Sequence, residues 1–409
     1  MKILVVSNYY PPFEIGGWEQ LTCDVAGELA RRGHQLQVLT SNHKAEAVSR
    51  PEPTIARQLH LQSPDPFHYR ARSSLLAGRR DRQNRAVLDH WLTRFQPDIV
   101  FINGLWNLSP RLAEAAEEMA GRRIIYYMAS PWPLEADAHT IFWDDPAGRT
   151  WRRWPKKWLG ALVRPLFLRP FPAKQLAFRR VLCVSRYIQQ MMIEQVGVPP
   201  ANTQVVYNGI EPELFGAKLV NRQSSMVIRL LYAGQIRADK GLHTAIEALA
   251  QALPHHPNLS LTIVGGGAPG YISQLKERVQ QLGLESVVTF GRQVGREAMP
   301  AIFAEHDVLL FPSIWPEPLA RVVQEAMACG LVVIGTTTGG TPELLQNDHN
   351  GLTFAAENAT QLAEKIGQIA SNPNLAATLA RNSRQTILAH FTLTRMADQL
   401  EQIFVDLTN

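Results

Sequence analysis

Two glutamates, separated by seven residues, stand in a mostly apolar part of the chain. The segment SIWPEPLARVVQEAMACG, residues 313–330, places Glu317 between two prolines and Glu325 inside an apolar run. Pro318 suits the first turn of a helix, so the pattern predicts a buried helix over residues 318–329. A buried carboxylate needs hydrogen-bond donors, and Arg321 is the only basic residue of this helix one turn away on the same face. A ligand is therefore one source of the missing donors.

Amide and basic side chains follow a predicted strand about eighty residues earlier. The segment AGQIRADKG, residues 233–241, carries Gln235, Arg237 and Lys240 where the chain turns from a strand into a helix. Such groups suit a phosphate, because the N–H groups of the helix and the cationic side chains both point at it. A solvated surface turn is the alternative, and this segment alone does not decide between the two.

A glycine-rich stretch follows the next predicted strand. The sequence VGGGAPG holds Gly265, Gly267 and Gly270 at the GxGxxG spacing of dinucleotide sites. That fingerprint also requires an acidic residue at the end of the following strand, where Arg292 stands instead. A tight turn with close helix packing is therefore favoured over NAD binding.

One nucleotide-sugar would satisfy the groups of these segments together. Glu317 would accept hydrogen bonds from sugar hydroxyls, and Glu325, about 9 Å along the predicted helix from Leu319, would accept them from the ribose diol. The diphosphate would lie over the N–H groups of Leu319 to Val322, near Lys240. The alternative, a core helix with one polar defect, leaves Glu325 unexplained.

Apolar strands and amphipathic helices alternate along the chain and must position these groups. The alternation starts twice, so the sequence predicts an α/β protein with two Rossmann-like domains facing across a cleft, where ligands bind at the carboxyl ends of the strands. The expected domains are residues 1–207 and 208–390, followed by an amphipathic helix at 391–409 with Met396, Leu400 and Phe404 at spacing four. The expected strands are 2–7, 33–40, 97–104, 122–129, 180–185, 228–234, 259–266, 286–292, 307–313 and 331–336.

Composition narrows the class of protein. The 409 residues are 45% hydrophobic and 19% charged, which is typical of a globular protein with two or three domains. Three well-separated cysteines predict neither a disulfide framework nor a zinc site. The apolar run Ile3–Val6 is too short for a signal peptide, and no segment reaches membrane-spanning length. We therefore expect a cytoplasmic protein.

Charge is distributed unevenly between the two halves. Residues 1–215 carry 27 Lys and Arg against 20 Asp and Glu, a net +7, whereas residues 216–409 carry 14 against 16, a net −2. The halves are therefore expected to have different partners. No helix-turn-helix, zinc-finger or RNP pattern is present, so nucleic acid is not among those expected.

Six motifs in combination resemble the GT-B fold retaining glycosyltransferases of family 4, also described as glycosyl transferases group 1. The motifs are GGWEQ, VVYNGIEPELF, GQIRADKG, IVGGGAPG, PSIWPEPLARVVQEAMACG and TTTGGTPELL, in the family's order and over almost the whole chain. The resemblance implies a nucleotide-sugar donor on the C-terminal domain, an acceptor on the N-terminal domain, and a last helix that crosses back to the N-terminal domain. It also implies front-face transfer with retained anomeric configuration, no enzyme nucleophile, and no metal or other cofactor.

The resemblance also assigns roles to residues. It implies that Gly17 approaches the donor phosphates and that Lys240 neutralises the leaving diphosphate. The chain departs from the family at Gln235, where Arg is usual and Arg237 is the candidate replacement, and in lacking a histidine after the fourth strand. Leu319 and Ala320 replace a common Phe-Gly. The predicted catalytic residues are Lys240, Glu317 and Arg237, and the predicted donor-binding residues are Gly16, Gly17, Gly234, Gln235, Gly265, Arg292, Pro318, Leu319, Ala320, Arg321 and Glu325.

A basic, aromatic segment lies in the half expected to bind the acceptor. Residues 149–180 contain ten basic side chains and no acidic one, with tryptophans and leucines between them. Tryptophans beside Lys and Arg are typical of peripheral contact with an anionic membrane, which predicts a lipid-linked glycan acceptor. A solvated basic helix with its apolar side on the core is the alternative. The residues assigned to this region are Trp151, Arg152, Arg153, Trp154, Lys156, Lys157 and Trp158.

Other functional classes stay open. A phosphorylase would need a lysine for pyridoxal phosphate and a longer chain, and an epimerase would need no large basic acceptor surface. A glycosyltransferase with a soluble acceptor, and a non-catalytic carbohydrate- or membrane-binding protein on the same scaffold, are the remaining alternatives. The favoured expectation is a UDP-sugar such as UDP-glucose, used in exopolysaccharide or glycolipid synthesis at the inner face of the cell membrane.

Overall fold

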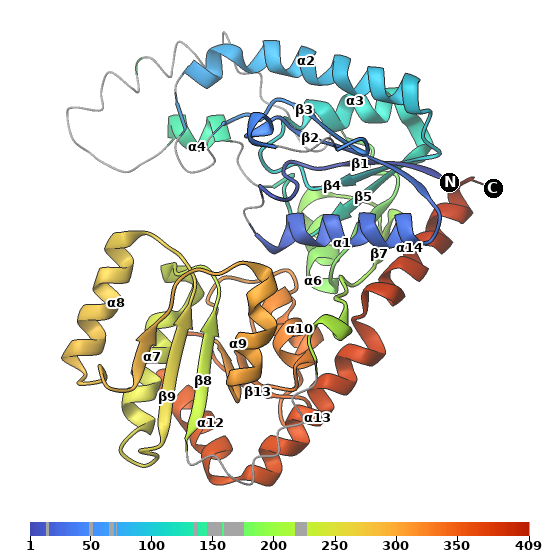
Figure 1. The fold of residues 1–409 in the computed structure, drawn as a ribbon. Coiled ribbons are helices and arrows are strands. Elements are labelled where there is room, and N and C mark those ends of the chain that lie inside the picture. The colour runs from blue at the N-terminus through green and yellow to red at the C-terminus, as the bar shows by residue number, and fades with distance from the viewer. Residues whose placement is uncertain are drawn as a thin grey trace. The chain divides into compact units, whose positions relative to one another are not determined.

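The computed structural model describes residues 1–13, 16–48, 52–64, 69–70, 72–134, 138–144, 158, 176–216 and 227–408. The chain forms two compact units, Met1–Val206 with Ala397–Asn409, and Tyr207–Met396. Each unit is an α/β domain built on a parallel sheet (Figure 1). The fold class predicted from the sequence is confirmed.

The first unit contains a seven-stranded sheet with the order β3-β2-β1-β4-β5-β6-β7. Strand β1 pairs on both sides, so that Ile3 lies opposite Leu36 and Ile99. Helices α2 and α3 lie on one side of this sheet and α1 on the other (Figure 1). Both faces of β1 are therefore covered, and its residues Ile3–Val6 are all apolar. The elements are β1 Lys2–Val6, α1 Gly17–Arg31, β2 Gln35–Ser41, β3 Ile55–Leu59, α2 Arg72–Phe95, β4 Ile99–Asn103, α3 Arg111–Ala120, β5 Ile124–Met128, α4 Ala138–Asp144, β6 Val181–Cys183, α6 Arg186–Met191 and β7 Thr203–Val205.

The last helix, α14 (Leu393–Thr408), contributes its residues from Ala397 onward to the first unit. Phe404 is fully buried, and its ring lies against that of Phe101 with centroids 5.7 Å apart. On the polar side, Glu401 pairs with Arg32 at 2.5 Å and with the His34 ring at 2.7 Å. The helix is therefore held to the first unit by both apolar and charged contacts.

The second unit contains a six-stranded parallel sheet with the order β10-β9-β8-β11-β12-β13. Its core is a continuous cluster of apolar residues from the strands and from α7, α8, α12 and α13. The elements are β8 Ile228–Ala233, α7 Leu242–Ala252, β9 Leu259–Val264, α8 Pro269–Gln281, β10 Val288–Phe290, α9 Met299–Glu305, β11 Val308–Phe311, α10 Arg321–Ala328, β12 Val332–Thr336, α11 Thr341–Leu344, β13 Leu352–Phe354, α12 Ala359–Ser371 and α13 Pro373–His390.

Three strands are absent from the sequence-based expectations, and all three lie at sheet edges. Strands β3 and β7 are the two edges of the first sheet, and β13 is one edge of the second. An edge strand has a neighbour on one side only, so it can be short and partly polar, as in the TQV of β7. Such strands lack the long apolar run that marks the central strands.

Candidate functional site

Strands β8 and β11 are neighbours in the second sheet, although β9 and β10 lie between them in the chain. The order of strands reverses at this point, and in parallel α/β sheets such a switch point leaves a crevice at the carboxyl ends of the strands. The loops that follow β8 and β11 carry Lys240 and Glu317 respectively. Both residues therefore lie where proteins of this architecture bind ligands.

The two loops are joined through their backbones. The amides of Ile314 and Trp315 both donate to the carbonyl of Asp239, at 2.9 and 2.8 Å. Gly241 follows with φ of +67°, and a Cβ there would stand 2.0 Å from the carbonyl oxygen of Pro312. Only glycine permits so close an approach, so the sequence fixes the distance between the loops at this point.

Lys240 and Glu317 are direct partners. The Lys240 ammonium donates to Glu317 Oε1, and the Ser313 hydroxyl lies 3.5 Å from the same oxygen. Both charged side chains are 18% exposed, so they are partly withdrawn from water yet open to it. The sequence predicts a diphosphate as the partner of the lysine and a sugar as the partner of the glutamate, and nothing in it indicates their ion pair.

Helix α10 begins at Arg321, later than predicted. The Glu317 carbonyl accepts from the Gly340 amide at 2.7 Å, which holds this residue in the loop rather than in a helix. Ala320 is the N-cap, with extended dihedral angles, so Pro318 and Leu319 precede the helix. The predicted helical spacing of about 9 Å between Leu319 and Glu325 is therefore wrong, because the residues between them are not all helical. The first-turn amides belong instead to residues 321–323.

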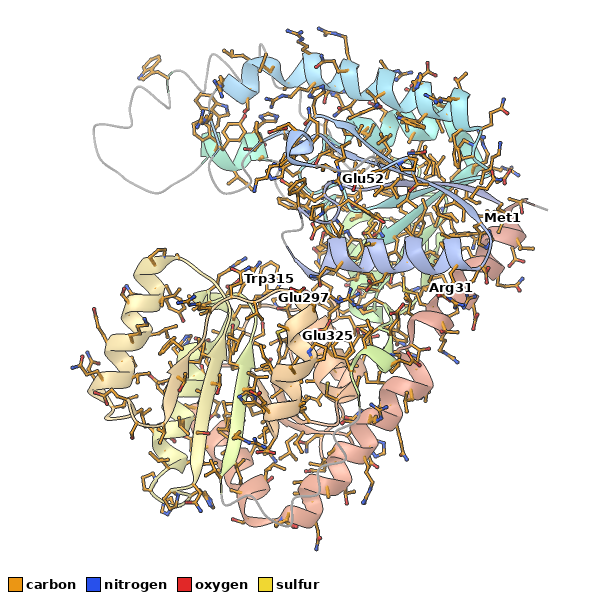
Figure 2. All side chains as sticks on the ribbon, in the orientation of Figure 1. Met1, Arg31, Glu52, Glu297, Trp315 and Glu325 are labelled. Carbon is orange, nitrogen blue, oxygen red and sulfur yellow. The ribbon has the colours of Figure 1, made fainter. Side chains whose placement is uncertain are left out.

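Glu325 is buried, as predicted, with 7% of its surface exposed. Its place in the second unit is labelled in Figure 2. Its Oε1 lies 3.9 Å from Nε of Arg321, one helical turn earlier. Arg321 is therefore an internal cation near this carboxylate, at a distance too long for a hydrogen bond between these two atoms. The neighbouring Gln324 is fully buried too and exchanges hydrogen bonds with Asn208 at 2.8 and 3.1 Å. Nothing in the sequence pattern marked that pair.

The glycine-rich stretch is built for contact between two backbones. A Cβ on Gly265 would stand 1.8 Å from the carbonyl oxygen of Gly234, and one on Gly267 would stand 2.0 Å from that of Ile236. A Cβ on Gly270 would meet nothing within 4 Å. The expected tight turn is therefore present, but its close neighbour is the loop after β8 rather than a helix.

Gln235 and Arg237 lie side by side in the loop after β8. The Arg237 guanidinium is 3.5 Å from Gln235 Oε1 and forms an ion pair with Asp239 at 2.7 Å. The Tyr232 hydroxyl donates to the Gln235 carbonyl at 2.7 Å, and burial raises the pKa of that tyrosine, so it stays a neutral donor. Arg292, after β10, is exposed.

The switch point of the first sheet lies between β1 and β4, and no Lys–Glu pair joins its described loops. Gly16 is the N-cap of α1, its amide donates to Glu19 at 3.0 Å, and Gly17 opens the helix. The Trp18 ring stacks on Tyr127 with centroids 5.5 Å apart. The indole N–H of Trp18 donates to the carbonyl of Asn103. Trp18 is therefore fixed at this point by the fully buried Tyr127 and Asn103.

Most of the predicted membrane and acceptor residues lie outside the part of the chain that the structure describes. Trp151, Arg152, Arg153, Trp154, Lys156 and Lys157 lie outside the described residues. Trp158 is described, and its side chain is 73% exposed.

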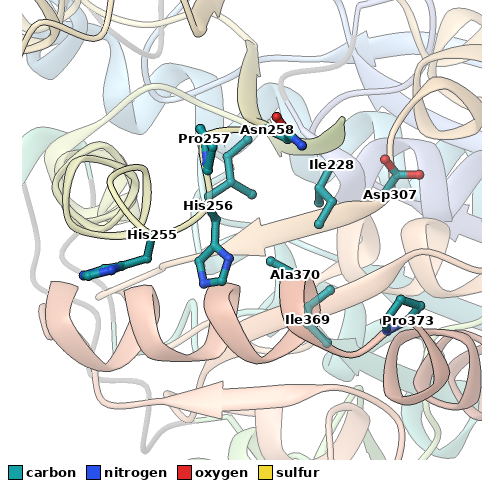
Figure 3. Close-up of a pocket in the computed structure, with 10 residues that line it drawn as sticks. Ile228, His255, His256, Pro257, Asn258, Asp307, Ile369, Ala370 and Pro373 are labelled. Carbon is teal, nitrogen blue, oxygen red and sulfur yellow. The ribbon is translucent and has the colours of Figure 1, made fainter. Parts of the chain in front are cut away.

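A cavity of 440 Å³ lies at the opposite edge of the second sheet (Figure 3). It is lined by the first residues of β8 and β9, by His255 and His256 after α7, and by the end of α12. Ligands of parallel sheets bind at the carboxyl edge, so this cavity is not part of the candidate site. Within the described ranges, no group of three or more His, Cys, Asp or Glu side chains is arranged to hold a metal ion.

Comparison with known proteins gives matches over both units. Spore coat protein SA of Bacillus subtilis is 27% identical over 242 residues, which are 55% of this chain. The match spans 64% of the length of that relative. The structure of a glycosyltransferase from Rickettsia africae aligns with a TM-score of 0.74 at 19% identity, covering 99% of this chain and 98% of that one.

A second solved structure, that of HepE from Anabaena in complex with UDP-glucose, aligns with a TM-score of 0.67 at 21% identity over 99% of this chain and 100% of that one. Family models match in two consecutive parts. Residues 15–214 match the model described as Glycosyltransferase Family 4, and residues 220–386 match Glycosyl transferases group 1. The chain therefore belongs to the family 4, group 1 glycosyltransferases of GT-B fold.

Proposed function

We propose that this chain is a retaining glycosyltransferase that transfers a hexose from a nucleotide-diphosphate donor, with a UDP-sugar favoured, to a lipid-linked glycan acceptor without a metal ion. The observation that carries the proposal is the meeting of Lys240 and Glu317 at the switch point of the second sheet. The complex of HepE with UDP-glucose, on a similar fold, supports the choice of donor.

Lys240 has the central electrostatic role in this proposal. Departure of the diphosphate builds negative charge on the β-phosphate while the sugar carbon becomes oxocarbenium-like. A fixed cation aimed at that charge stabilises the transition state without rearranging during the reaction. The bound diphosphate replaces Glu317 as the partner of the lysine, and the released carboxylate then accepts hydrogen bonds from the sugar hydroxyls.

The other charged groups have supporting roles. Arg237 exchanges Asp239 for the diphosphate, in the position next to Gln235 where the family resemblance implies an arginine. Glu325 accepts hydrogen bonds from the ribose diol, with the Arg321 guanidinium 3.9 Å away. Because the leaving group is activated by cations and amides, a front-face displacement needs no carboxylate nucleophile, which is consistent with retention.

The acceptor assignment depends on the first half of the chain. Its net charge of +7 and the tryptophan-rich segment 149–180 favour an anionic lipid surface over a soluble acceptor. Among the described helices, none is both long and apolar enough to cross a bilayer. We therefore propose peripheral contact with the inner face of the cell membrane, in the synthesis of a cell-surface polysaccharide or glycolipid.

A nucleotide panel tests the donor assignment. UDP, GDP and ADP are compared by their effect on the melting temperature, and UDP is expected to give the largest rise. Turnover of UDP-glucose is then followed with a short-chain lipid-linked glycan, and NMR of the product gives the anomeric configuration. Inverted configuration would contradict retention, and the absence of any nucleotide effect together with no turnover would contradict the proposed function.

A further inference from the structure

Helix α2 has an outward face that no described element of the first unit covers. It lies at the outside of that unit, over α3 (Figure 1). Leu75 and Leu76, in its first two turns, are 52% and 37% exposed. Adjacent exposed leucines on a helix are unlike the scattered apolar residues of an ordinary protein surface, and they suggest contact with an apolar partner.

The exposed face is continuous along the first three turns of α2. At about 3.6 residues per turn, Arg72, Arg79 and Arg82 fall on the same side of the helix as the two leucines. All three arginines are exposed. The opposite side is buried through Ser73, Ser74, Asn84 and Leu88. This face, consisting of Arg72, Leu75, Leu76, Arg79 and Arg82, is called the α2 face below.

Polar contacts on the buried side prevent the helix from turning its leucines inward. The Ser74 hydroxyl accepts from Trp143 Nε1 and lies within hydrogen-bond distance of the Tyr69 hydroxyl, both at 2.8 Å. Asn84 accepts from the His60 amide at 2.7 Å and donates to the His60 carbonyl at 2.9 Å. Rolling the helix would break these four buried or partly buried hydrogen bonds.

The charge of the α2 face is strongly positive at its amino end. Residues 72–80 contain three arginines and no acidic residue. Arg80 turns inward and donates to the carbonyls of Leu61 and Gln62, whereas Arg72 and Arg79 remain exposed beside the leucines. Leucines flanked by arginines match the boundary of an anionic bilayer, where acyl chains lie next to phosphate groups.

We propose that the α2 face docks on an anionic phospholipid surface, with Leu75 and Leu76 at the acyl-chain boundary and the three arginines on headgroup phosphates. The inference rests on the proposed function, because a lipid-linked acceptor requires the enzyme to work at a membrane. It names residues other than those of the segment 149–180. A soluble polyanion would contact the arginines and leave the leucines in water, whereas an anionic membrane would contact both.

Vesicle co-sedimentation of the full chain tests the α2 face. Vesicles of phosphatidylcholine mixed with phosphatidylglycerol are compared with phosphatidylcholine alone, at low and high salt. The double variant Leu75→Ser/Leu76→Ser and the double variant Arg79→Gln/Arg82→Gln should each bind the anionic vesicles on the order of tenfold more weakly than the wild type. Leu388→Ser and Arg381→Gln, exposed positions on α13, are the matched controls and should bind as the wild type does.

The outcomes separate this inference from the proposed function. Wild-type protein that ignores anionic vesicles, or leucine variants that bind them unchanged, would overturn the α2 face as a membrane contact even if turnover with UDP-glucose is found. Loss of binding only in the arginine variants would assign the face to a soluble polyanion and would overturn it too. Weaker binding in both double variants, with no turnover of any nucleotide-sugar, would contradict the proposed enzyme but not the membrane contact. Unchanged melting temperatures exclude misfolding.

Discussion

In both units the strand order of the sheet reverses beside the unit's first strand, but the residues at that point differ. In the second unit the loops at the switch point present an ammonium and a carboxylate, Lys240 and Glu317. In the first unit the corresponding point holds Trp18, which stacks on the buried Tyr127 and donates to the carbonyl of the buried Asn103. The strand order therefore determines where a ligand can bind, and the loops determine whether that place suits a charged or a neutral group.

Replacement of Lys240 is expected to have the largest effect on activity, because it removes the cation at the switch point of the second sheet. Lys240→Ala removes the cation that faces the diphosphate and leaves Glu317 partly buried without its partner. We expect kcat/KM for the nucleotide-sugar to fall by about a hundredfold or more. Steady-state kinetics measures the change, and Lys365→Ala, a surface lysine near Gln368, is the control. Equal activity of the two variants would remove Lys240 from the donor site.

Replacement of Glu325 is expected to affect donor binding less than replacement of Lys240 does. Glu325→Ala removes the acceptor proposed for the ribose and leaves Arg321 at low exposure without that carboxylate. We expect UDP to bind about tenfold more weakly, as measured by calorimetry, and the melting temperature to fall. Gln324→Ala, on the same helix, breaks the contact with Asn208 and should lower the melting temperature alone. Equal loss of UDP affinity in both variants would mean that Glu325 acts only through the fold.

Substitution of alanine for one glycine at each switch point compares the two units directly. A Cβ on Gly265 would meet a backbone oxygen at 1.8 Å, whereas one on Gly104 would meet the Trp18 side chain at 2.3 Å. Because a side chain can move and a paired backbone cannot, Gly265→Ala should lower the free energy of unfolding by about 2–4 kcal/mol and Gly104→Ala by about 1–3 kcal/mol. Denaturant titration measures both, with Gly270→Ala as a control expected to be neutral. The reverse order would show that Trp18 is fixed more firmly than the glycine loops.

Acid should weaken the first unit through Glu28. The hydrogen bond from Arg31 lowers the pKa of Glu28 below its usual value and outweighs the opposite effect of burial. Since the folded-state pKa is lower than the unfolded one, this stabilisation is present above the unfolded pKa and is lost as pH falls through the folded pKa. Glu28→Gln should therefore flatten the decline of melting temperature below about pH 4.5. A decline identical to that of the wild type would remove Glu28 as a cause.

Removal of metal ions should have the smallest effect. If Lys240 and the first-turn amides of α10 supply the positive field at the charged edge, turnover should be unchanged in excess EDTA. The measurement is the initial rate before and after chelation, with added magnesium as the control. Loss of activity that magnesium restores would contradict the electrostatic account of that edge.

Much of the fold could be predicted because the central strands of both sheets are long apolar runs. KILVV and IRLLYA each contain four consecutive apolar residues, and each strand has a neighbour on both sides. The edge strand β7 contributes only TQV, and it could not be found because it has little apolar surface to bury. The burial of a central strand on all sides therefore also makes it apolar enough to be recognised in the sequence.

The site was only partly predictable for a different reason. The residue types at Lys240, Glu317 and Glu325 indicate charge chemistry, and their places after strands indicate the edge of the sheet. Their partners depend on distances between segments far apart in sequence, such as the 77 positions between Lys240 and Glu317. The start of α10 depends on a bond from Gly340 to the Glu317 carbonyl, which no local propensity of the segment contains.

The first unit is formed by two separate stretches of sequence, which affects how it folds during synthesis. Its core includes Phe404, from the end of the chain, against Phe101, and its surface includes the pair of Glu401 with Arg32. On the ribosome, the residues up to Val206 emerge long before the helix that completes them, whereas the second unit is contiguous and can fold as it appears. The nascent first unit must therefore keep an apolar surface uncovered while the whole second unit is synthesised, and its core is completed only after the second unit has emerged.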